Sequence, residues 1–89
     1  MAMMNLSEAA HAVGGTVRGR DVAFDAVNTD SRSVRRGDLF VALRGGRFDG
    51  HGFIGQAAAA GAVAALVDNE QQAAGLPLLL VADTRRALG

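Results

Sequence analysis

The apolar run Leu39–Leu43 constrains the fold more than any other segment of this 89-residue chain. It has the length of a β-strand and contains no polar residue. A strand with one face in water alternates apolar and polar side chains, whereas a strand that is apolar throughout is covered on both faces. The run therefore predicts an interior strand of a layered α/β domain.

The segments on either side of this run supply the other layers. Asn5 and Glu8 have the spacing of a capping box, and the apolar residues that follow predict a helix to Val13, ended by Gly14. A second helix is predicted from residue 50 or 51 to 60, with Asp49 as its cap. The predicted strands are residues 16–18, 22–27, 39–43, 63–67 and 76–82.

The order of these elements predicts the fold class. Between residues 39 and 82 the order is strand, helix, strand, strand, which requires some parallel pairing. We therefore expect an α/β fold with a small mixed sheet and helices packed on it. Residues 1–82 form one domain in this interpretation, and residues 83–89 begin a further helix or linker.

Composition excludes several classes of function. The chain has no cysteine, so disulfides and thiol chemistry are excluded. Its two histidines lie forty residues apart without carboxylates at ligand spacing, so no metal site is expected. The net charge is zero, which predicts no nucleic-acid partner and no membrane surface. No signal peptide or membrane-length apolar run is recognisable, so we expect a cytoplasmic protein.

Positive charge is concentrated in one part of the chain. All nine basic residues are arginines, and residues 32–47 hold five of them against one aspartate, a local charge of +4. Arginine presents a planar fork of donors that suits phosphate and carboxylate groups. The compositional bias toward arginine explains its use in place of lysine but not this clustering.

The segment Arg44–Gly52 is the first candidate binding connection. Its glycines let backbone amides approach an anion, and the helix predicted after it would present free N–H groups. Arg47 adds charge, Phe48 could stack on a flat ring, and His51 could act as a neutral hydrogen-bonding group. The alternative is a simple strand-to-helix turn in which Asp49 only caps the helix.

The polar run Asn28–Ser33 follows the predicted strand at 22–27, and Thr29–Arg32 within it is the second candidate segment. Ser31 offers a hydroxyl and backbone groups that could recognise the edge of a base. Asp30 could pair with Arg32 or with an arginine of the other connection. The alternative is a turn that satisfies its own backbone. No GxxxxGK[ST] phosphate loop is present, so the sequence shows no ATP site.

The string TDSRSVRRGDLFVALRGGRFDGH, residues 29–51, resembles the amino-terminal domain of the Mur ligases, which add amino acids to the peptidoglycan precursor. The form RGGRFDGHGF and the ending LPLLLVADTRRALG look most like the MurF-type members, which add D-alanyl-D-alanine. The resemblance extends from Leu6 to Gly89. Gly46 and Gly52 stand where many relatives have glutamate and aspartate, so individual ligand contacts can differ.

The resemblance implies a role for each connection. The first domain of these enzymes holds the UDP end of UDP-N-acetylmuramoyl-tripeptide, while absent domains use ATP and Mg²⁺ to join D-alanyl-D-alanine to it. No catalytic residue is expected in this chain. The substrate-binding residues that the resemblance implies are Ser31, Arg32, Arg47, Phe48, Asp49, Gly50 and His51. The alternatives are a MurE-type ligase, a stand-alone nucleotide- or anion-binding module, and a structural or protein-interaction domain.

Overall fold

The structure is a computed structural model that describes residues 4–30, 32–42, 44–45, 48–49, 53–68 and 75–82. For residues 44–45 and 48–49 the description covers the backbone only. The predicted third helix, from residue 83 or 84, lies outside these ranges.

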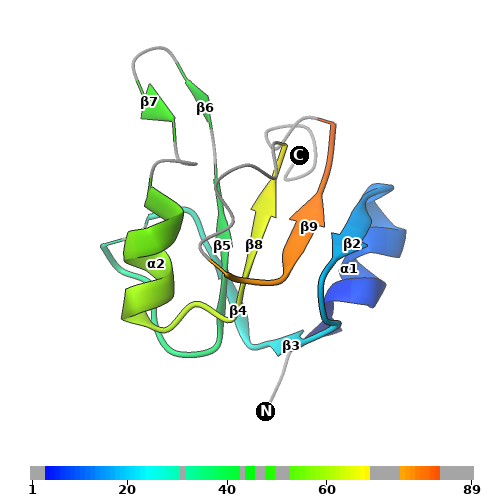
Figure 1. The fold of residues 1–89 in the computed structure, drawn as a ribbon, viewed down its shortest axis with the longest axis horizontal. Helices are drawn as coiled ribbons and strands as arrows, with labels where there is room; N and C mark the ends of the chain where they lie inside the picture. The colour runs from blue at the N-terminus through cyan, green and yellow to red at the C-terminus, as the bar shows by residue number, and fades with distance from the viewer. Residues whose placement is uncertain are drawn as a thin grey trace.

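A five-stranded sheet with the order β2-β9-β8-β5-β4 forms the centre of the molecule (Figure 1). Four of its strands run parallel, and the edge strand β2 is antiparallel to β9. This arrangement confirms the predicted small mixed sheet. The strands are β2 (Thr16–Arg18), β4 (Ala26–Asn28), β5 (Asp38–Val41), β8 (Ala64–Val67) and β9 (Leu78–Leu80).

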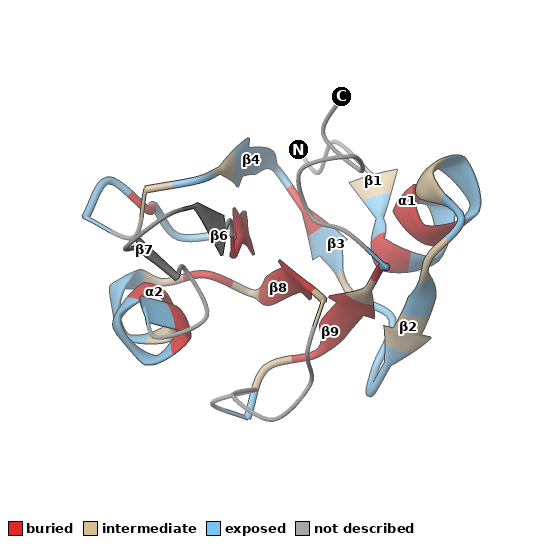
Figure 2. Cartoon of the chain, turned by 90° about the horizontal axis from the view of Figure 1, so that it is seen from above, coloured by how far each residue is buried: buried red, intermediate tan, exposed pale blue. Residues whose placement is uncertain are grey.

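One helix covers each face of the sheet, so the domain has three layers (Figure 2). Helix α1 (Leu6–Val13) packs on the face formed by Leu39, Val41 and Leu66. Helix α2 (Ile54–Ala60) packs on the opposite face, against Phe40 and Val67. All four residues of β5 and all four of β8 are buried, which confirms that the Leu39 run is covered on both sides.

Helix α1 begins and ends as its sequence predicts. The backbone N–H of Asn5 donates to the Glu8 carboxylate at 3.1 Å, as a capping box requires. Gly14 ends the helix in the left-handed conformation, with φ of 71°. Buried Leu6, Ala9 and Ala10 form the face that contacts the sheet.

The single strand predicted at residues 22–27 is wrong, because the chain divides at Asp25. Strand β3 (Ala23–Phe24) pairs with β1 (Met4–Asn5), while β4 pairs with β5. The Asp25 backbone N–H instead donates to the Gly37 carbonyl at 2.9 Å. The break allows one stretch of extended chain to serve two different sheets.

The predicted start of the second helix is also wrong. Helix α2 begins at Ile54 with Phe53 at its N-cap, whereas Asp49 belongs to the two-residue strand β7 (Phe48–Asp49). Strand β7 pairs antiparallel with β6 (Arg44–Gly45), with Arg44 opposite Asp49. An extended residue in a ladder cannot cap a helix that begins five positions later. Gly61 ends α2, as predicted.

Candidate functional site

The two polar segments that the sequence singled out leave the sheet at the same edge. Strands β4 and β5 are parallel neighbours, with Asn28 opposite Phe40. Parallel strands end at a common edge, and this carboxyl edge is where α/β sheets bind ligands. We call residues 29–37 the first connection and residues 42–53 the second connection.

The figures place the described parts of both connections at the α2 end of the molecule. Figure 1 shows β6 and β7 beyond the end of β5, on the side of α2 and away from α1. Figure 2, which looks down on this edge, shows the chain after β4 on that same side. The geometry therefore brings the two segments to one region, although they are separated along the chain.

The structure describes only part of the predicted site. Arg32 is described with its side chain, and Phe48 and Asp49 through their backbone in β7. The other predicted site residues lie outside the described residues: Ser31, Arg47, Gly50 and His51.

Asp30 and Arg32 form an ion pair within the first connection. The Arg32 guanidinium donates to the Asp30 carboxylate from Nε at 3.2 Å and from Nη2 at 3.3 Å, and the Arg32 backbone N–H donates to it at 2.9 Å. Hydrogen bonds from the Arg32 side chain and then from its backbone hold the pKa of Asp30 below its ordinary value. The sequence allowed Asp30 to pair with Arg32 or with an arginine of the second connection. In the structure Asp30 pairs with Arg32.

The pair is accessible to solvent, with the side chains of Arg32 and Asp30 83% and 45% exposed. An exposed ion pair contributes little stability and exchanges readily. The guanidinium of Arg32 is consequently available to a competing anion. Arg35 and Arg36 are also exposed, but they lie at the other end of the first connection, just before β5 begins.

Asn28, which is not among the site residues predicted from the sequence, organises the first connection. Its Nδ2 donates to the Ser33 carbonyl at 3.0 Å and to Asp38 Oδ2 at 3.5 Å. Its Oδ1 accepts from the Asp30 backbone N–H at 2.9 Å and from the Ser33 hydroxyl at 3.4 Å. Its position at a strand end before Thr-Asp-Ser was the one signal in the sequence.

Asp38 fixes the other end of the first connection. It is 5% exposed and is the only buried polar or charged residue in the described part of the chain. Its Oδ2 accepts from the Arg35 backbone N–H at 2.9 Å, and its backbone N–H donates to the Arg35 carbonyl at 3.1 Å. Val34 is buried against α2 between these polar ends. The connection is therefore tied to the sheet at both ends and in its middle.

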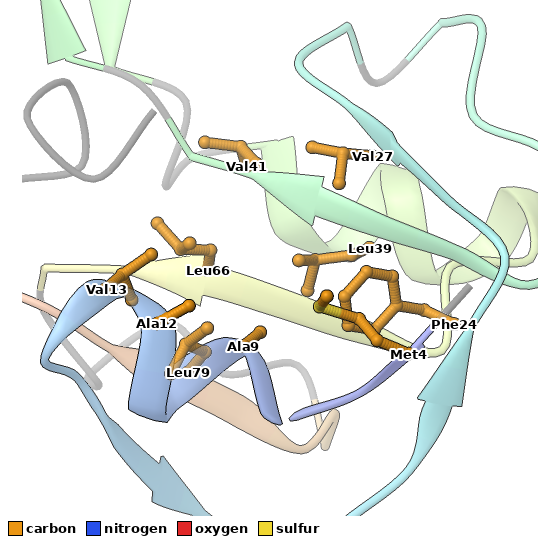
Figure 3. A pocket seen from close by; sticks show the side chains of 10 residues that line it. All are labelled: Met4, Ala9, Ala12, Val13, Phe24, Val27, Leu39, Val41, Leu66 and Leu79. Carbon is orange, nitrogen blue, oxygen red and sulfur yellow. The ribbon is translucent and has the colours of Figure 1, made fainter. Parts of the chain in front are cut away.

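A separate apolar pocket of about 160 Å³ lies on the α1 face (Figure 3). Figure 3 shows only hydrocarbon and thioether side chains around it. Such a lining offers no donors for a phosphate and no partner for a base edge, so the pocket does not suit a nucleotide. Its largest lining residues are Met4, Phe24, Leu39, Leu66 and Leu79.

Two kinds of feature were not found within the described ranges. No group of three or more His, Cys, Asp or Glu residues is placed to hold a metal ion there. No helix among the same residues is long and apolar enough to cross a membrane.

Comparison with known proteins gives consistent matches. The profile of the family described as "Mur ligase family, catalytic domain" matches residues 23–89. The chain is 46% identical over 89 residues to UDP-N-acetylmuramoyl-tripeptide--D-alanyl-D-alanine ligase of Escherichia coli (strain K12), covering 100% of this chain and 20% of that protein. It is 43% identical over 88 residues to UDP-N-acetylmuramoyl-L-alanyl-D-glutamate--2,6-diaminopimelate ligase of Streptomyces avermitilis, covering 94% and 17%.

The fold matches a solved structure equally well. The crystal structure of MurF from Acinetobacter baumannii superposes with a TM-score of 0.85 at 35% identity, covering 96% of this chain and 19% of that one. The chain thus spans about one fifth of the length of the first of these relatives.

The fold and the arrangement of its polar segments define a three-layer α/β domain with two connections gathered at one sheet edge. Sequence identity and structural similarity together show to which family the chain belongs. The chain belongs to the Mur ligase family, and its fold is that of the amino-terminal domain of MurF.

Proposed function

We propose that this chain holds the UDP end of UDP-N-acetylmuramoyl-tripeptide in a MurF-type ligase that makes a peptidoglycan precursor. The observation that carries this proposal is the parallel pairing of β4 and β5, from which both polar connections leave at one edge. The proposed contacts are Ser31 and Arg32 on the first connection and Arg47, Phe48, Asp49, Gly50 and His51 on the second.

The charge of the first connection supports a diphosphate-bearing ligand. Among the described residues Asp30 is the partner of the exposed Arg32, so a phosphate oxygen could replace that carboxylate at modest cost. Arg35 and Arg36 lie at the amino end of β5, where Gly37 bonds to Gly61, and are not among the proposed contacts. The domain would supply positioning, because an anchored far end brings the reacting carboxylate to its partner.

The remainder of the proposed enzyme supplies the chemistry. In this proposal residues 1–82 are the UDP-binding domain and residues 83–89 lead toward a domain that binds ATP and Mg²⁺. ATP transfers its terminal phosphoryl group to the substrate carboxylate and leaves as ADP. The amine of D-alanyl-D-alanine then attacks the acyl phosphate, and phosphate leaves as the amide forms. The enzyme works in the cytoplasm.

Calorimetric titration of the 89-residue chain with UDP, UMP and sulfate tests the binding function. We expect binding that depends on uridine and is tighter for UDP than for UMP, because the second phosphate adds charge that the arginines can pair. Equal weak binding of all three would favour the alternative of a generic anion-binding module.

We also expect the 89-residue chain to lack ligase activity, since its sequence contains no phosphate loop. The test is incubation with ATP, Mg²⁺, UDP-N-acetylmuramoyl-tripeptide and D-alanyl-D-alanine, followed by a phosphate assay. Release above the blank would contradict this prediction.

The MurE-type ligase is the second candidate for the whole protein, and the 43% identity to the Streptomyces avermitilis ligase favours keeping it. The two candidates share the UDP end of the substrate and differ in the amine that is added. An assay of the complete ligase with D-alanyl-D-alanine and with diaminopimelate separates them.

A further inference from the structure

We propose that Asn28 is a positioning residue, which presets the first connection for nucleotide binding without touching the nucleotide. This inference rests on the proposed function, because it concerns the affinity of that same site. Asn28 lies at the end of β4, and its amide bonds to Asp30 and Ser33 of the connection and to Asp38, the first residue of β5.

The hydrogen-bonding capacity of the Asn28 amide is fully used. A primary amide has two N–H donors and an oxygen with two lone pairs. The donors reach the Ser33 carbonyl at 3.0 Å and Asp38 Oδ2 at 3.5 Å. The oxygen accepts from the Asp30 N–H at 2.9 Å and from the Ser33 hydroxyl at 3.4 Å. Only an amide of this length provides donors and acceptors together at this position.

These bonds hold the residues that flank Ser31, the proposed uridine contact, in the sequence. Asp30 and Ser33 are further linked to each other, from the Ser33 N–H to the Asp30 carbonyl at 3.1 Å. Residue 31 lies between the two residues that Asn28 holds. A connection that is ordered before the ligand arrives loses less conformational entropy on binding, so its affinity is higher.

Asp38 makes the choice of an amide more stringent. Its carboxylate faces the Asn28 Nδ2, and the carbonyl of Ser33 faces the same atom. A carboxylate in place of the amide would set acceptor against acceptor at Ser33 and charge against charge at Asp38. Asn28→Asp therefore keeps the shape of the side chain while it reverses the two interactions that hold the turn.

The test compares UDP affinity and backbone amide signals in ¹⁵N-labelled 89-residue chains. For Asn28→Asp at neutral pH we expect at least a tenfold rise in the Kd for UDP, together with faster hydrogen exchange of the Asp30 and Arg35 amides. The signals of β8 and β9 should stay unchanged, which shows that the sheet is intact. A Kd within twofold of wild type in an intact chain overturns the inference.

Asp21→Asn is the matched control. Asp21 also locks a turn, through bonds from the Ser7 N–H at 3.0 Å and the Ser7 hydroxyl at 2.7 Å, but it precedes β3, at the opposite end of the sheet in Figure 1 from β6 and β7. We expect its Kd for UDP to stay within twofold of wild type. A comparable loss of affinity in both variants would mean that general destabilisation is the cause, and would overturn the inference.

Two further results keep the inference and the proposed function separable. If Asn28→Asp does not keep the native spectrum, Ser33→Ala decides, because it removes only the hydroxyl bonds at 3.3 and 3.4 Å. We expect a two- to threefold rise in its Kd, and no change overturns the inference. If wild type does not bind UDP, the proposed function fails, while amide exchange in Asn28→Asp still tests whether Asn28 orders the turn.

Discussion

At the scale of single residues, side chains that accept backbone N–H bonds hold the connections of this domain. Asp21, Asn28, Asp30 and Asp38 each do so with at least one N–H donor. Their geometry depends on protonation state or amide identity, so the local order of these connections responds to pH and to isosteric substitution.

Asp21 gives a prediction about acid stability. The hydroxyl and backbone N–H of Ser7 lower the pKa of Asp21 below its ordinary value. A carboxyl whose pKa is lower in the folded state stabilises the fold above its unfolded pKa, and this stabilisation is lost as the pH falls through the folded value. We therefore expect urea unfolding to give a lower free energy of unfolding for Asp21→Asn than for wild type at neutral pH. This difference should shrink below about pH 4.

Ser7→Ala controls for this pH dependence, because the Ser7 hydroxyl is the largest cause of the shift. In that background the effect of Asp21→Asn should be smaller at neutral pH. A difference between wild type and Asp21→Asn that stays constant from pH 7 to pH 3 would contradict the account of Asp21.

At the scale of elements, the sequence predicted what depends on local pattern and missed what depends on pairing. Helix α1 was predictable because its cap and its apolar spacing lie within one segment. The break at Asp25 and the β6–β7 pair were not, because each depends on a partner strand or on a distant carbonyl. Asn28 was missed for the same reason, because three of its four hydrogen bonds reach residues that lie five or ten positions away.

The two helix-ending glycines give a matched pair of predictions. Gly14 has φ of 71° and no atom within 4 Å of an added Cβ, so Gly14→Ala should cost about 1 kcal/mol of unfolding free energy. Gly61 has φ of 118°, and an added Cβ would lie 2.8 Å from the Arg36 Cα. Because that contact is with backbone, Gly61→Ala should cost at least about 2 kcal/mol.

Urea unfolding of both variants measures the two costs. A smaller loss for Gly61→Ala than for Gly14→Ala would contradict the close packing of the end of α2 on the first connection. Gly55 extends the comparison, because it lies inside α2 with open space around it. Gly55→Ala should stabilise the chain by about 0.5 kcal/mol.

At the scale of the whole molecule, stability and the proposed function occupy different parts of the fold. The buried side chains lie on the two faces of the sheet, under α1 and α2. Both polar connections begin at the carboxyl edge, and most of the described residues of the first connection are exposed. Substitutions at the edge should therefore change ligand affinity more than unfolding free energy, and substitutions under the helices should do the reverse.

The fold and the family could be predicted from the sequence, but the arrangement of the candidate site could be predicted only in outline. The order of elements between residues 39 and 82 implied some parallel pairing, whereas the parallel pairing of β4 with β5 required coordinates. The pairing of Asp49 with Arg44 in a ladder and the ion pair between Asp30 and Arg32 could not be predicted from the sequence. For Asp49 and for Asp30 the sequence allowed more than one partner or role.

A UDP titration of the ¹⁵N-labelled chain, followed through the chemical shifts of its backbone amides, tests whether the two connections form one binding site. We expect the amide signals of Asp30 and Arg32 on the first connection and of Phe48 and Asp49 on the second to shift together with one Kd, while those of Ser7 and Asp21 do not move. Shifts confined to one connection, or centred on the α1 face, would contradict a site built from both.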